Sequence, residues 1–565
     1  MRLTAGSLVG VGLAAVLALG GCAALPQSGP VEEGLKGAGL EVPFVQGAAA
    51  PPALDASGDQ IVQGFLLAML AGNTDDFEVA RSYLTDEAAA AWNPLASVTI
   101  YQSGEAPSVT ESAAGPERMV ATYNQVGLVD EAGRYTPQEP SPGSATLELA
   151  QDDESQWRIA GLPDGIVIPR DVFQGDYVAT KVYFPSADGQ FLVPDQRLFA
   201  RARAATDAVR QFLAGPPPYL ARAVGAVVPP GTRLMTDTVM ISGGVATVNL
   251  SNAISRASET ARATVLASLK ASLTALPTVD SIELQVESLP LAVNASTALE
   301  INPWAVDGPA YLGDGGVWRW REGGAQLIDG TAPAANWASL TVDRSLGRMA
   351  GLEDGTVAVI NEVGEPAVTW ALPDGLGVPS AAPVFDRLGW LWVAAGSAVV
   401  AFSAEGEALS IGQSWLEGRR VVALAPSRDG ARVALVVESP ASDEVELLVS
   451  GIVRGDRAVP AELTEPLPVR RLAGPVDSLS WADDVSLAFL AAPAGSTEVT
   501  AVVMTVGGEA VFFKPPTDAP SSLAAGLGTT QLYVSGRSGG LFSYSAQGRV
   551  WSPLAAGASA VVLAP

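Results

Sequence analysis

The chain has no histidine among its 565 residues, and this absence narrows its chemistry more than any other feature of the composition. Histidine is the usual general base near neutral pH and the commonest protein ligand of transition metals. The sequence also has a single cysteine, at position 22, which excludes a disulfide framework. We therefore predict a protein with no catalytic residue, no metal site and no cofactor.

Basic residues are scarce as well. Sixty acidic side chains stand against 33 basic ones, which gives a formal net charge of −27, and only four of the basic residues are lysines. A surface of this sign repels nucleic acids and anionic lipid head groups. We predict that the chain binds no nucleic acid.

Long apolar runs are absent after residue 22, and the run near the start is short. Residues 8–19 form an uncharged apolar stretch of twelve, which follows Arg2 and precedes Gly20, Gly21 and Cys22. A helix needs about 20 apolar residues to cross a bilayer, so this length favours an export signal. The alternative is an uncleaved short membrane helix.

The residues around Cys22 are typical of a bacterial lipoprotein signal. Two small glycines precede the cysteine and leave the backbone open to a peptidase. We predict that residues 1–21 are a signal peptide and that Cys22 carries an S-diacylglycerol group and an N-acyl chain, such as palmitate. Stable anchoring requires two such signals, so the chain is expected on the outer face of the cell membrane, attached to the bilayer through Cys22.

Three domains are expected after a tether. Residues 22–54 are rich in Ala, Gly and Pro, which indicates a flexible tether. Residues 55–165 begin with a capping box at residues 57–60, continue with a helical stretch over 77–92 and end in alternating strand patterns. This order predicts an α+β domain with helices on one face of an antiparallel sheet, and fold-level similarity to NTF2-like cups is one interpretation.

The second domain is predicted over residues 175–290. It starts with a strand over 179–184 and a short strand over 191–194, followed by a helix with an apolar stripe that begins at Leu198. A hairpin around residues 242–244, a helix over 259–276 and a strand complete it. We predict a compact α+β unit.

Residues 301–565 are strand-like throughout, with a repeating pattern. Similar segments recur around positions 348, 390 and 432, and this spacing of 42 residues is the length of one propeller blade. The region is long enough for about six blades. The predicted fold is an all-β propeller of about six blades, and a pair of β-sandwiches is the alternative.

Three patterns could carry chemistry. Residues 536–540 match the G-x-S-x-G signature around Ser538, but that mechanism needs a histidine, and the match reads as a Gly-rich hairpin turn. Adjacent acids at 152–154 and 483–484 are interpreted as solvated loop charges, although a glycosidase needs only two carboxylates. Large aromatics of propeller blades usually pack in the core, although they can also stack on sugars. Four such residues lie near the start of the propeller: Trp304, Trp318, Trp320 and Trp337.

Residues 182–185, 213–216 and 244–251 resemble the GerMN domain of spore germination and envelope lipoproteins. The family usually has aspartate where Asn249 stands, which weakens any role of a carboxylate there. The resemblance implies a binding module and no catalytic residue.

The order of lipobox, tether, α+β domain, GerMN domain and propeller resembles the actinobacterial LpqB lipoprotein family along essentially the whole chain. The resemblance implies a non-enzymatic accessory lipoprotein that acts on a membrane sensor histidine kinase, in a two-component system for envelope homeostasis and division. Its expected partner is the kinase's extracellular domain. The alternative is an envelope glycan-binding protein or a carboxylate-based glycosidase that uses the propeller channel.

Overall fold

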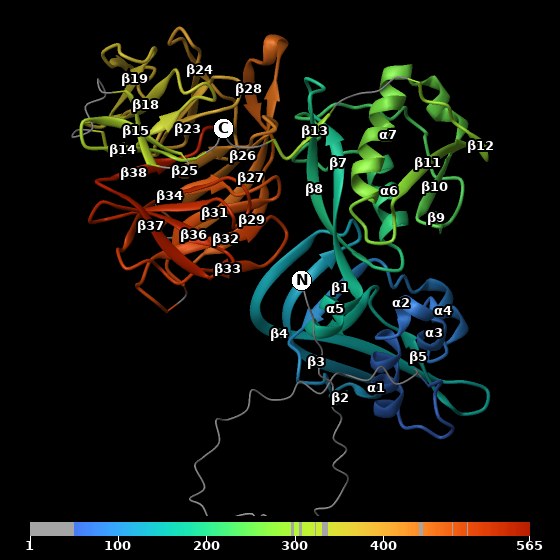
Figure 1. Cartoon of the computed structure of the whole chain (residues 1–565). Helices are drawn as coiled ribbons and strands as arrows, with labels where there is room; N and C mark the ends of the chain where they lie inside the picture. The colour runs from blue at the N-terminus through green and yellow to red at the C-terminus, as the bar shows by residue number, and fades with distance from the viewer. Residues whose placement is uncertain are drawn as a thin grey trace, which may run out of the picture. The chain divides into compact units, whose positions relative to one another are not determined.

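A computed structural model describes residues 50–294, 299–303, 308–321, 324–329, 337–439, 444–476, 478–493 and 495–565 (Figure 1). The predicted signal peptide, Cys22, most of the tether and Trp304 lie outside these residues. The chain from Ala48 onwards forms one compact unit, to which the description below is confined. Within the described residues no helix is long and apolar enough to cross a membrane.

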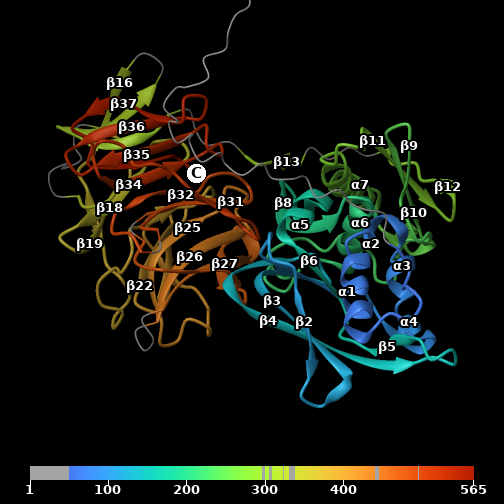
Figure 2. The ribbon, with the colours of Figure 1, turned by 90° about the horizontal axis from the view of Figure 1, so that it is seen from below.

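The N-terminal domain is a bent sheet with short helices against it. Its sheet order is β5-β4-β3-β1-β6, with β2 paired to β3. Its helices are α1 Gly58–Met69, α2 Gly72–Asp75, α3 Glu78–Arg81, α4 Asp86–Ala91 and α5 Arg170–Asp176. Its strands are β1 Ser97–Tyr101, β2 Ser108–Ser112, β3 Gly115–Asp130, β4 Tyr135–Gln151, β5 Trp157–Gly161 and β6 Ile166–Pro169. Helix α1 packs against the sheet, as Figure 2 shows from below.

Two predictions for this domain need correction. The helix predicted over 77–92 is divided into α3 and α4, because Thr85 caps a new helix by accepting the backbone N–H of Ala88. The sheet is mixed rather than antiparallel, since β1 pairs in parallel with β6, a strand beyond the predicted domain end at residue 165. The capping box at Ser57 is present as predicted.

The middle domain, from β7 to β13, places two helices against strands. Helices α6 Ala204–Ala214 and α7 Glu259–Leu273 pack on each other and on β7. Its strands are β7 Tyr177–Pro185, β8 Phe191–Ala200, β9 Met240–Ser242, β10 Val245–Leu250, β11 Ser281–Val286, β12 Leu289–Pro290 and β13 Glu300–Ile301, and a 3₁₀ turn η1 spans Asn252–Arg256. Strand β8 pairs along its whole length with β7, so Leu198 lies in a strand and the helix starts six residues later than predicted.

The C-terminal region is a propeller of six blades, which confirms the fold predicted from the 42-residue period. Blades 1 to 3 consist of β14 Ala310–Gly313, β15 Gly316–Arg321, β16 Gly324–Asp329 with β38 Ala560–Val562; β17 Thr341–Val342, β18 Met349–Glu353, β19 Thr356–Ile360, β20 Val368–Trp370; and β21 Val384–Phe385, β22 Leu391–Ala395, β23 Ala398–Phe402, β24 Ala408–Ser410. Blades 4 to 6 consist of β25 Arg420–Pro426, β26 Arg432–Ser439, β27 Glu444–Arg454, β28 Pro460–Leu463, β29 Leu467–Leu472 with the 3₁₀ turn η2 Asp456–Ala458; β30 Leu479–Trp481, β31 Ser486–Ala491, β32 Thr500–Thr505, β33 Ala510–Phe512; and β34 Pro520–Ala525, β35 Leu532–Gly536, β36 Gly540–Ser545, β37 Val550–Ala556. Strand β38 pairs with β14 and closes the ring.

The sequence period corresponds to a repeated turn between the first and second strands of a blade. In blade 2, Asp343 accepts the backbone N–H groups of Gly347 and Arg348. In blade 3, Asp386 accepts that of Trp390 in the same way. A side chain that bonds the backbone ahead of it stabilises such turns, which explains why the segments recur.

The middle domain and the propeller share a hydrophobic core. One cluster of buried residues contains Phe184 and Leu269 from the middle domain, Val436 from blade 4 and Phe489 from blade 5. The N-terminal domain has its own cluster around α1. The middle domain and blades 4 and 5 are therefore packed as one body.

Candidate functional site

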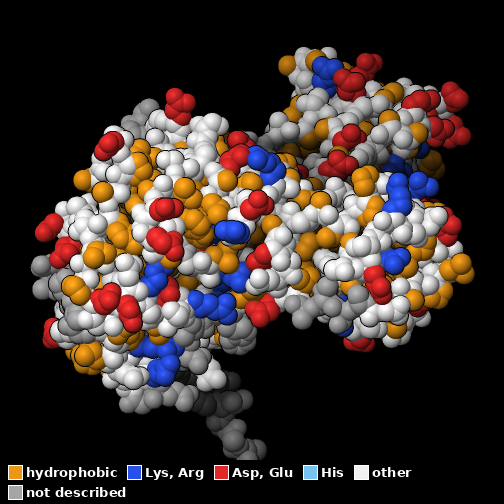
Figure 3. Space-filling view, turned by 90° about the horizontal axis from the view of Figure 1, so that it is seen from above, with side chains coloured by type: hydrophobic (Ala, Val, Ile, Leu, Met, Phe, Trp, Pro, Cys, Tyr) orange, Lys and Arg blue, Asp and Glu red, His pale blue; other side chains and the backbone are white. Residues whose placement is uncertain are grey.

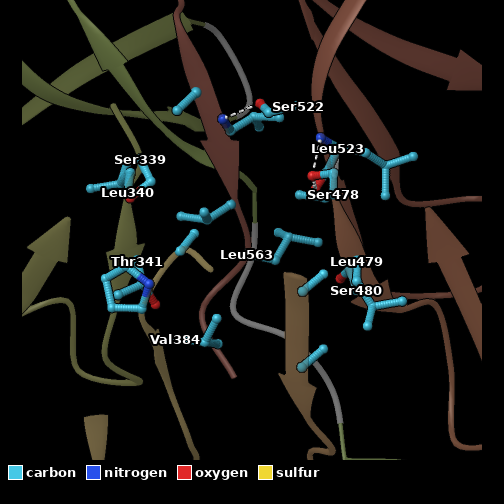
Figure 4. A pocket seen from close by; sticks show the side chains of 18 of the residues that line it. Ser339, Leu340, Thr341, Val384, Ser478, Leu479, Ser480, Ser522, Leu523 and Leu563 are labelled. Carbon is cyan, nitrogen blue, oxygen red and sulfur yellow. Dashed lines mark hydrogen bonds between the residues drawn. The ribbon is translucent and has the colours of Figure 1, made fainter. Parts of the chain in front are cut away.

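The central channel of the propeller is the first candidate site. It is a cavity of about 250 Å³ lined by the innermost strands of all six blades. Small and apolar side chains dominate its wall, with hydroxyl groups between them (Figure 4). The lining hydroxyl residues are Ser339, Thr341, Ser478, Ser480, Ser521, Ser522 and Ser559.

Several of these hydroxyls join neighbouring blades. Ser478 accepts the backbone N–H of Leu523 in the next blade at 3.0 Å, and Ser522 accepts that of Val561 at 2.8 Å (Figure 4). Innermost strands leave backbone donors unpaired on the side facing the channel, and a buried donor without a partner is unfavourable. The hydroxyls therefore hold the ring together.

The lining does not suit the glycosidase alternative. Among the described residues that line the channel there is no aspartate or glutamate, and that mechanism requires two carboxylates. Arg428 is the charged residue in the wall, and its guanidinium donates to the carbonyls of Trp481 and Ala525. Burial lowers the pKa of Arg428 to about 10, which leaves it protonated near neutral pH.

Three of the four tryptophans singled out in the sequence lie in the described residues, and none of these three lines the channel. Trp337 is buried between blades 1 and 2, and Trp318 and Trp320 pack partly buried beside Tyr311. Their positions agree with packing between blades.

Ser538 lies in the hairpin turn between β35 and β36, as the sequence indicates. Its hydroxyl donates to Asp518 at 2.7 Å, and its backbone N–H donates to the same carboxylate. Hydrogen bonds from Ser538 hold the pKa of the exposed Asp518 carboxyl below its ordinary value. These hydrogen bonds stabilise the turn. They do not provide the histidine that would be needed to activate the serine hydroxyl.

The acidic pairs have different surroundings. Asp152 accepts backbone N–H groups in its own turn, as expected of a loop acid. Asp484 is buried, which contradicts its interpretation as a solvated charge. Its carboxylate accepts Lys181 at 2.7 Å and the hydroxyl of Tyr183 at 3.2 Å, and both partners lie on β7 of the middle domain.

Arg432 extends this junction and is almost completely buried. Its guanidinium forms an ion pair with Asp429 and donates to the carbonyl of Pro194 on β8 at 3.2 Å. It also donates to the carbonyl of Asp484 at 2.7 Å and lies over the ring of Trp481. One side chain thus bridges blades 4 and 5 and the middle domain.

Residues of strand β8, in the middle domain, contact both the propeller and the N-terminal domain. Asp195 and Arg197 form a buried ion pair on it, and Arg197 also donates to the carbonyl of Ala132 in the N-terminal domain. Tyr219 donates to Asp195 at 3.0 Å, while its carbonyl accepts the hydroxyl of Thr464 in blade 4 at 2.6 Å. We call this set of contacts, together with those of Arg432 and Asp484, the β8 junction.

The electrostatics of the β8 junction follow from burial. Desolvation and the neighbouring Asp484 carboxylate raise the pKa of Tyr183 well above its ordinary value. Desolvation and Asp195 do the same to the pKa of Tyr219. Both phenols therefore remain neutral donors. The junction was missed in the sequence because its contacts between the middle domain and the propeller join residues more than 200 positions apart.

Asn249, where the GerMN pattern has aspartate, has a structural role. Its side-chain carbonyl accepts the backbone N–H of Ser288 at 2.9 Å, and its amide donates to the Ser288 hydroxyl at 3.1 Å. Glu287 and Ser288 have positive φ angles in the turn between β11 and β12. The amide therefore stabilises that turn.

Comparisons with known proteins agree with this architecture. Residues 51–174 match the family model "Lipoprotein LpqB, N-terminal domain", and residues 315–563 match "Lipoprotein LpqB beta-propeller domain". These two models together match more than half of the chain. The chain belongs to the LpqB lipoprotein family. Residues 181–292 match the model "Sporulation and spore germination", which confirms the GerMN resemblance of the middle domain.

Relatives named Lipoprotein LpqB match over different lengths. The Streptomyces coelicolor protein is 27% identical over 88% of each chain. The Cutibacterium acnes protein is 36% identical over 44% of this chain and 41% of its own length. The Mycobacterium tuberculosis protein is 32% identical over 41% of this chain and 38% of its own.

Solved structures show more distant similarity. The first GerMN domain of the sporulation protein GerM from Bacillus subtilis is 20% identical, and the match covers 22% of this chain and 93% of that chain, with a TM-score of 0.18. A gluconolactonase from Xanthomonas campestris is 17% identical, and the match covers 46% of this chain and 90% of that chain, with a TM-score of 0.30.

Proposed function

We propose that this LpqB-family lipoprotein is a non-enzymatic accessory regulator, lipid-anchored through Cys22 on the outer face of the cell membrane. In this proposal it binds the extracellular domain of a membrane sensor histidine kinase and changes the output of a two-component system for envelope homeostasis. The observation that carries the proposal is that buried charged side chains make structural contacts between domains. In the described part of the chain, the ion pair of Lys181 with Asp484 joins the middle domain to the propeller. Arg432 and Arg197 each pair with an aspartate of their own domain and also donate to a backbone carbonyl of a neighbouring domain.

A compact multidomain unit on a tether suits this role. A flexible tether of roughly 30 residues spans about 30 Å root-mean-square, which keeps the domains close to the membrane. A partner in the same layer is met at high effective concentration, so a weak contact is sufficient. Acidic and basic side chains are both scattered among apolar ones over the face in Figure 3. The net charge of −27 of the whole chain favours a basic partner surface.

The anchor is tested by changing Cys22→Ala. Without the thiol no diacylglycerol group can be attached, so the variant should accumulate as precursor or leave the detergent-rich phase. The measurement is phase partitioning with analysis of the mature N-terminus. A variant that still partitions with membranes and is cleaved after Gly21 would contradict the lipoprotein anchor.

The partner is tested by titrating purified residues 23–565 with the kinase's extracellular domain, using calorimetry. Phosphorylation of the response regulator is measured in parallel in a strain that lacks the lipoprotein. No binding up to about 100 μM, which corresponds to about −5.5 kcal/mol, together with unchanged phosphorylation would exclude the regulator and favour the glycan-binding alternative. Surface point variants should replace deletion of the middle domain, because deletion would expose the shared core of blades 4 and 5.

A further inference from the structure

A second cavity lies where the middle domain meets blades 3 and 4. Its volume is about 420 Å³, within the range of about 300–1,000 Å³ usual for small-molecule sites, which often lie at domain interfaces. The middle domain contributes the turn 186–188 and Ala223. The propeller contributes Leu388, the turn 429–431, Ile452 and residues 454, 455, 457 and 458. We call this cavity the interdomain crevice.

Most charged side chains in the crevice wall already have hydrogen-bond or ion-pair partners within the protein. Asp429 pairs with Arg432 and accepts the Ser427 hydroxyl at 2.6 Å. Arg454 donates to Asp386 at 2.7 Å and to two backbone carbonyls. These groups build the wall and leave little capacity for a ligand.

Arg457, on the propeller side, is the exception. Its side chain is exposed, and no hydrogen bond or ion pair to it is found within the described residues. The backbone of Arg457 and of Ala458 is left-handed, with φ of 55° and 59°. Left-handed backbone is unfavourable for residues other than glycine, so the loop holds this shape at the expense of stability. A hydrogen bond from Gly455 N–H to the Val459 carbonyl at 2.8 Å secures it.

Asp188, on the middle-domain side, carries the opposite charge. Its Oδ1 accepts the Ser186 hydroxyl and the Gln190 backbone N–H at 3.1 Å. Its Oδ2 lies 3.5 Å from Arg387, outside the distance of a strong charge-assisted hydrogen bond. The Asp188 side chain is 25% exposed, so Oδ2 retains capacity to accept a donor from the crevice.

Apolar side chains line the same crevice. Ala223, Leu388, Ala431 and Ile452 face the crevice from both domains. A cation from the propeller and a carboxylate from the middle domain, in a crevice that also has apolar walls, match a small molecule that carries both charges. We propose that the interdomain crevice binds a zwitterionic short peptide or amino acid, whose carboxylate pairs with Arg457 and whose ammonium group pairs with Asp188. Such a ligand would link the middle domain to the propeller.

The test is calorimetric titration of residues 23–565 with alanine peptides of one to four residues, which scan the separation of the two termini. At least one peptide with free termini should bind saturably, and its N-acetylated and C-amidated forms should bind at least about tenfold more weakly, since a charged hydrogen-bond partner contributes about that factor. The variants R457A and D188N should each weaken binding by a similar factor. The control R549A removes an exposed arginine that is also left-handed, at φ of 52°, in blade 6, and should bind like the wild type.

Melting temperatures of all variants are measured to verify that they fold. No saturable binding of any peptide up to about 10 mM, roughly −3 kcal/mol, would overturn the proposal. Equal binding by R457A or D188N variants that melt like the wild type would overturn it as well, as would equal binding of the acetylated or amidated peptides. The titration contains no kinase, so its outcome is independent of the proposed regulatory function.

Discussion

The propeller channel and the β8 junction handle polar groups in opposite ways. The channel is lined by neutral hydroxyls, which accept backbone N–H groups of the neighbouring blade. The junction instead buries ion pairs, with Arg432 and Asp195 almost fully enclosed. A buried ion pair contributes little net stability, because desolvation offsets the attraction, but losing one partner is strongly unfavourable. The comparison shows that neutral hydroxyls join blade to blade in the channel, whereas buried charged side chains join the middle domain to the propeller at the β8 junction.

The largest effect is expected at the centre of the junction. In the variant Arg432→Met, Asp429 would remain buried without its cation, and the free energy of unfolding should fall by about 3–5 kcal/mol. The measurement is urea unfolding. The control is Arg420→Met, whose ion pair with Glu438 is partly exposed to solvent, so its loss should change the free energy of unfolding by less than about 1 kcal/mol. If both variants lost the same free energy of unfolding, the ion pair of the junction would be no more important for stability than one at the surface.

The junction should also respond to alkaline pH. The raised pKa of Tyr183 means that the folded chain keeps the phenolic proton at a pH at which the unfolded chain has lost it. This contribution is complete below the ordinary tyrosine pKa of 10.0 and is lost as pH rises above it. The free energy of unfolding should therefore fall from about pH 9 to 11, and less steeply in Tyr183→Phe and Asp484→Asn. If the free energy of unfolding fell with pH as steeply in both variants as in the wild type, the Tyr183 phenol would not be the source of this pH dependence.

A smaller effect is expected in the channel. In Ser478→Ala the backbone N–H of Leu523 loses its acceptor, which should lower the free energy of unfolding by about 1 kcal/mol. The matched control is Ser559→Ala. Ser559 lines the same channel, and its hydroxyl makes no hydrogen bond among the described residues. A loss as large as that of Arg432→Met would mean that hydroxyl contacts and ion pairs are equivalent in this protein.

The smallest effect is expected at Ser538, outside both regions. Ser538→Ala removes a hydrogen bond to the exposed Asp518, and the cellular phenotype should not change. A covalent serine-hydrolase probe should label neither the wild type nor the variant, because the chain has no histidine to activate the hydroxyl. Labelling that disappears in the variant would contradict the non-enzymatic function.

Local patterns in the sequence predicted much of the fold. The 42-residue period is visible because each blade repeats a turn in which a side chain such as Asp343 accepts the backbone ahead of it. The capping box at Ser57 and the turn around Ser538 are equally local. Such contacts join residues a few positions apart, so their chemistry can be read along the chain.

The β8 junction could not be predicted in this way. Asp484 has the same sequence appearance as a solvated loop acid, and its partner Lys181 lies more than 300 positions earlier. Leu198 fits an apolar helical stripe, but pairing with Ala179 on β7 holds it in a strand. Tertiary pairing overrides local preference at these positions, and only the folded chain brings the partners together.

The closure of the propeller by β38 has a consequence for how the protein folds. Ala310 of the first blade pairs with Val562, so the ring is sealed by residues from the two ends of the C-terminal region. Contacts between such distant positions incur the loop-closure entropy before they contribute any stability, which makes them slow to form. Until β38 arrives, the edge of β14 is unpaired and open to strands of other chains. The interval before ring closure is therefore a period in which the folding chain is exposed to aggregation.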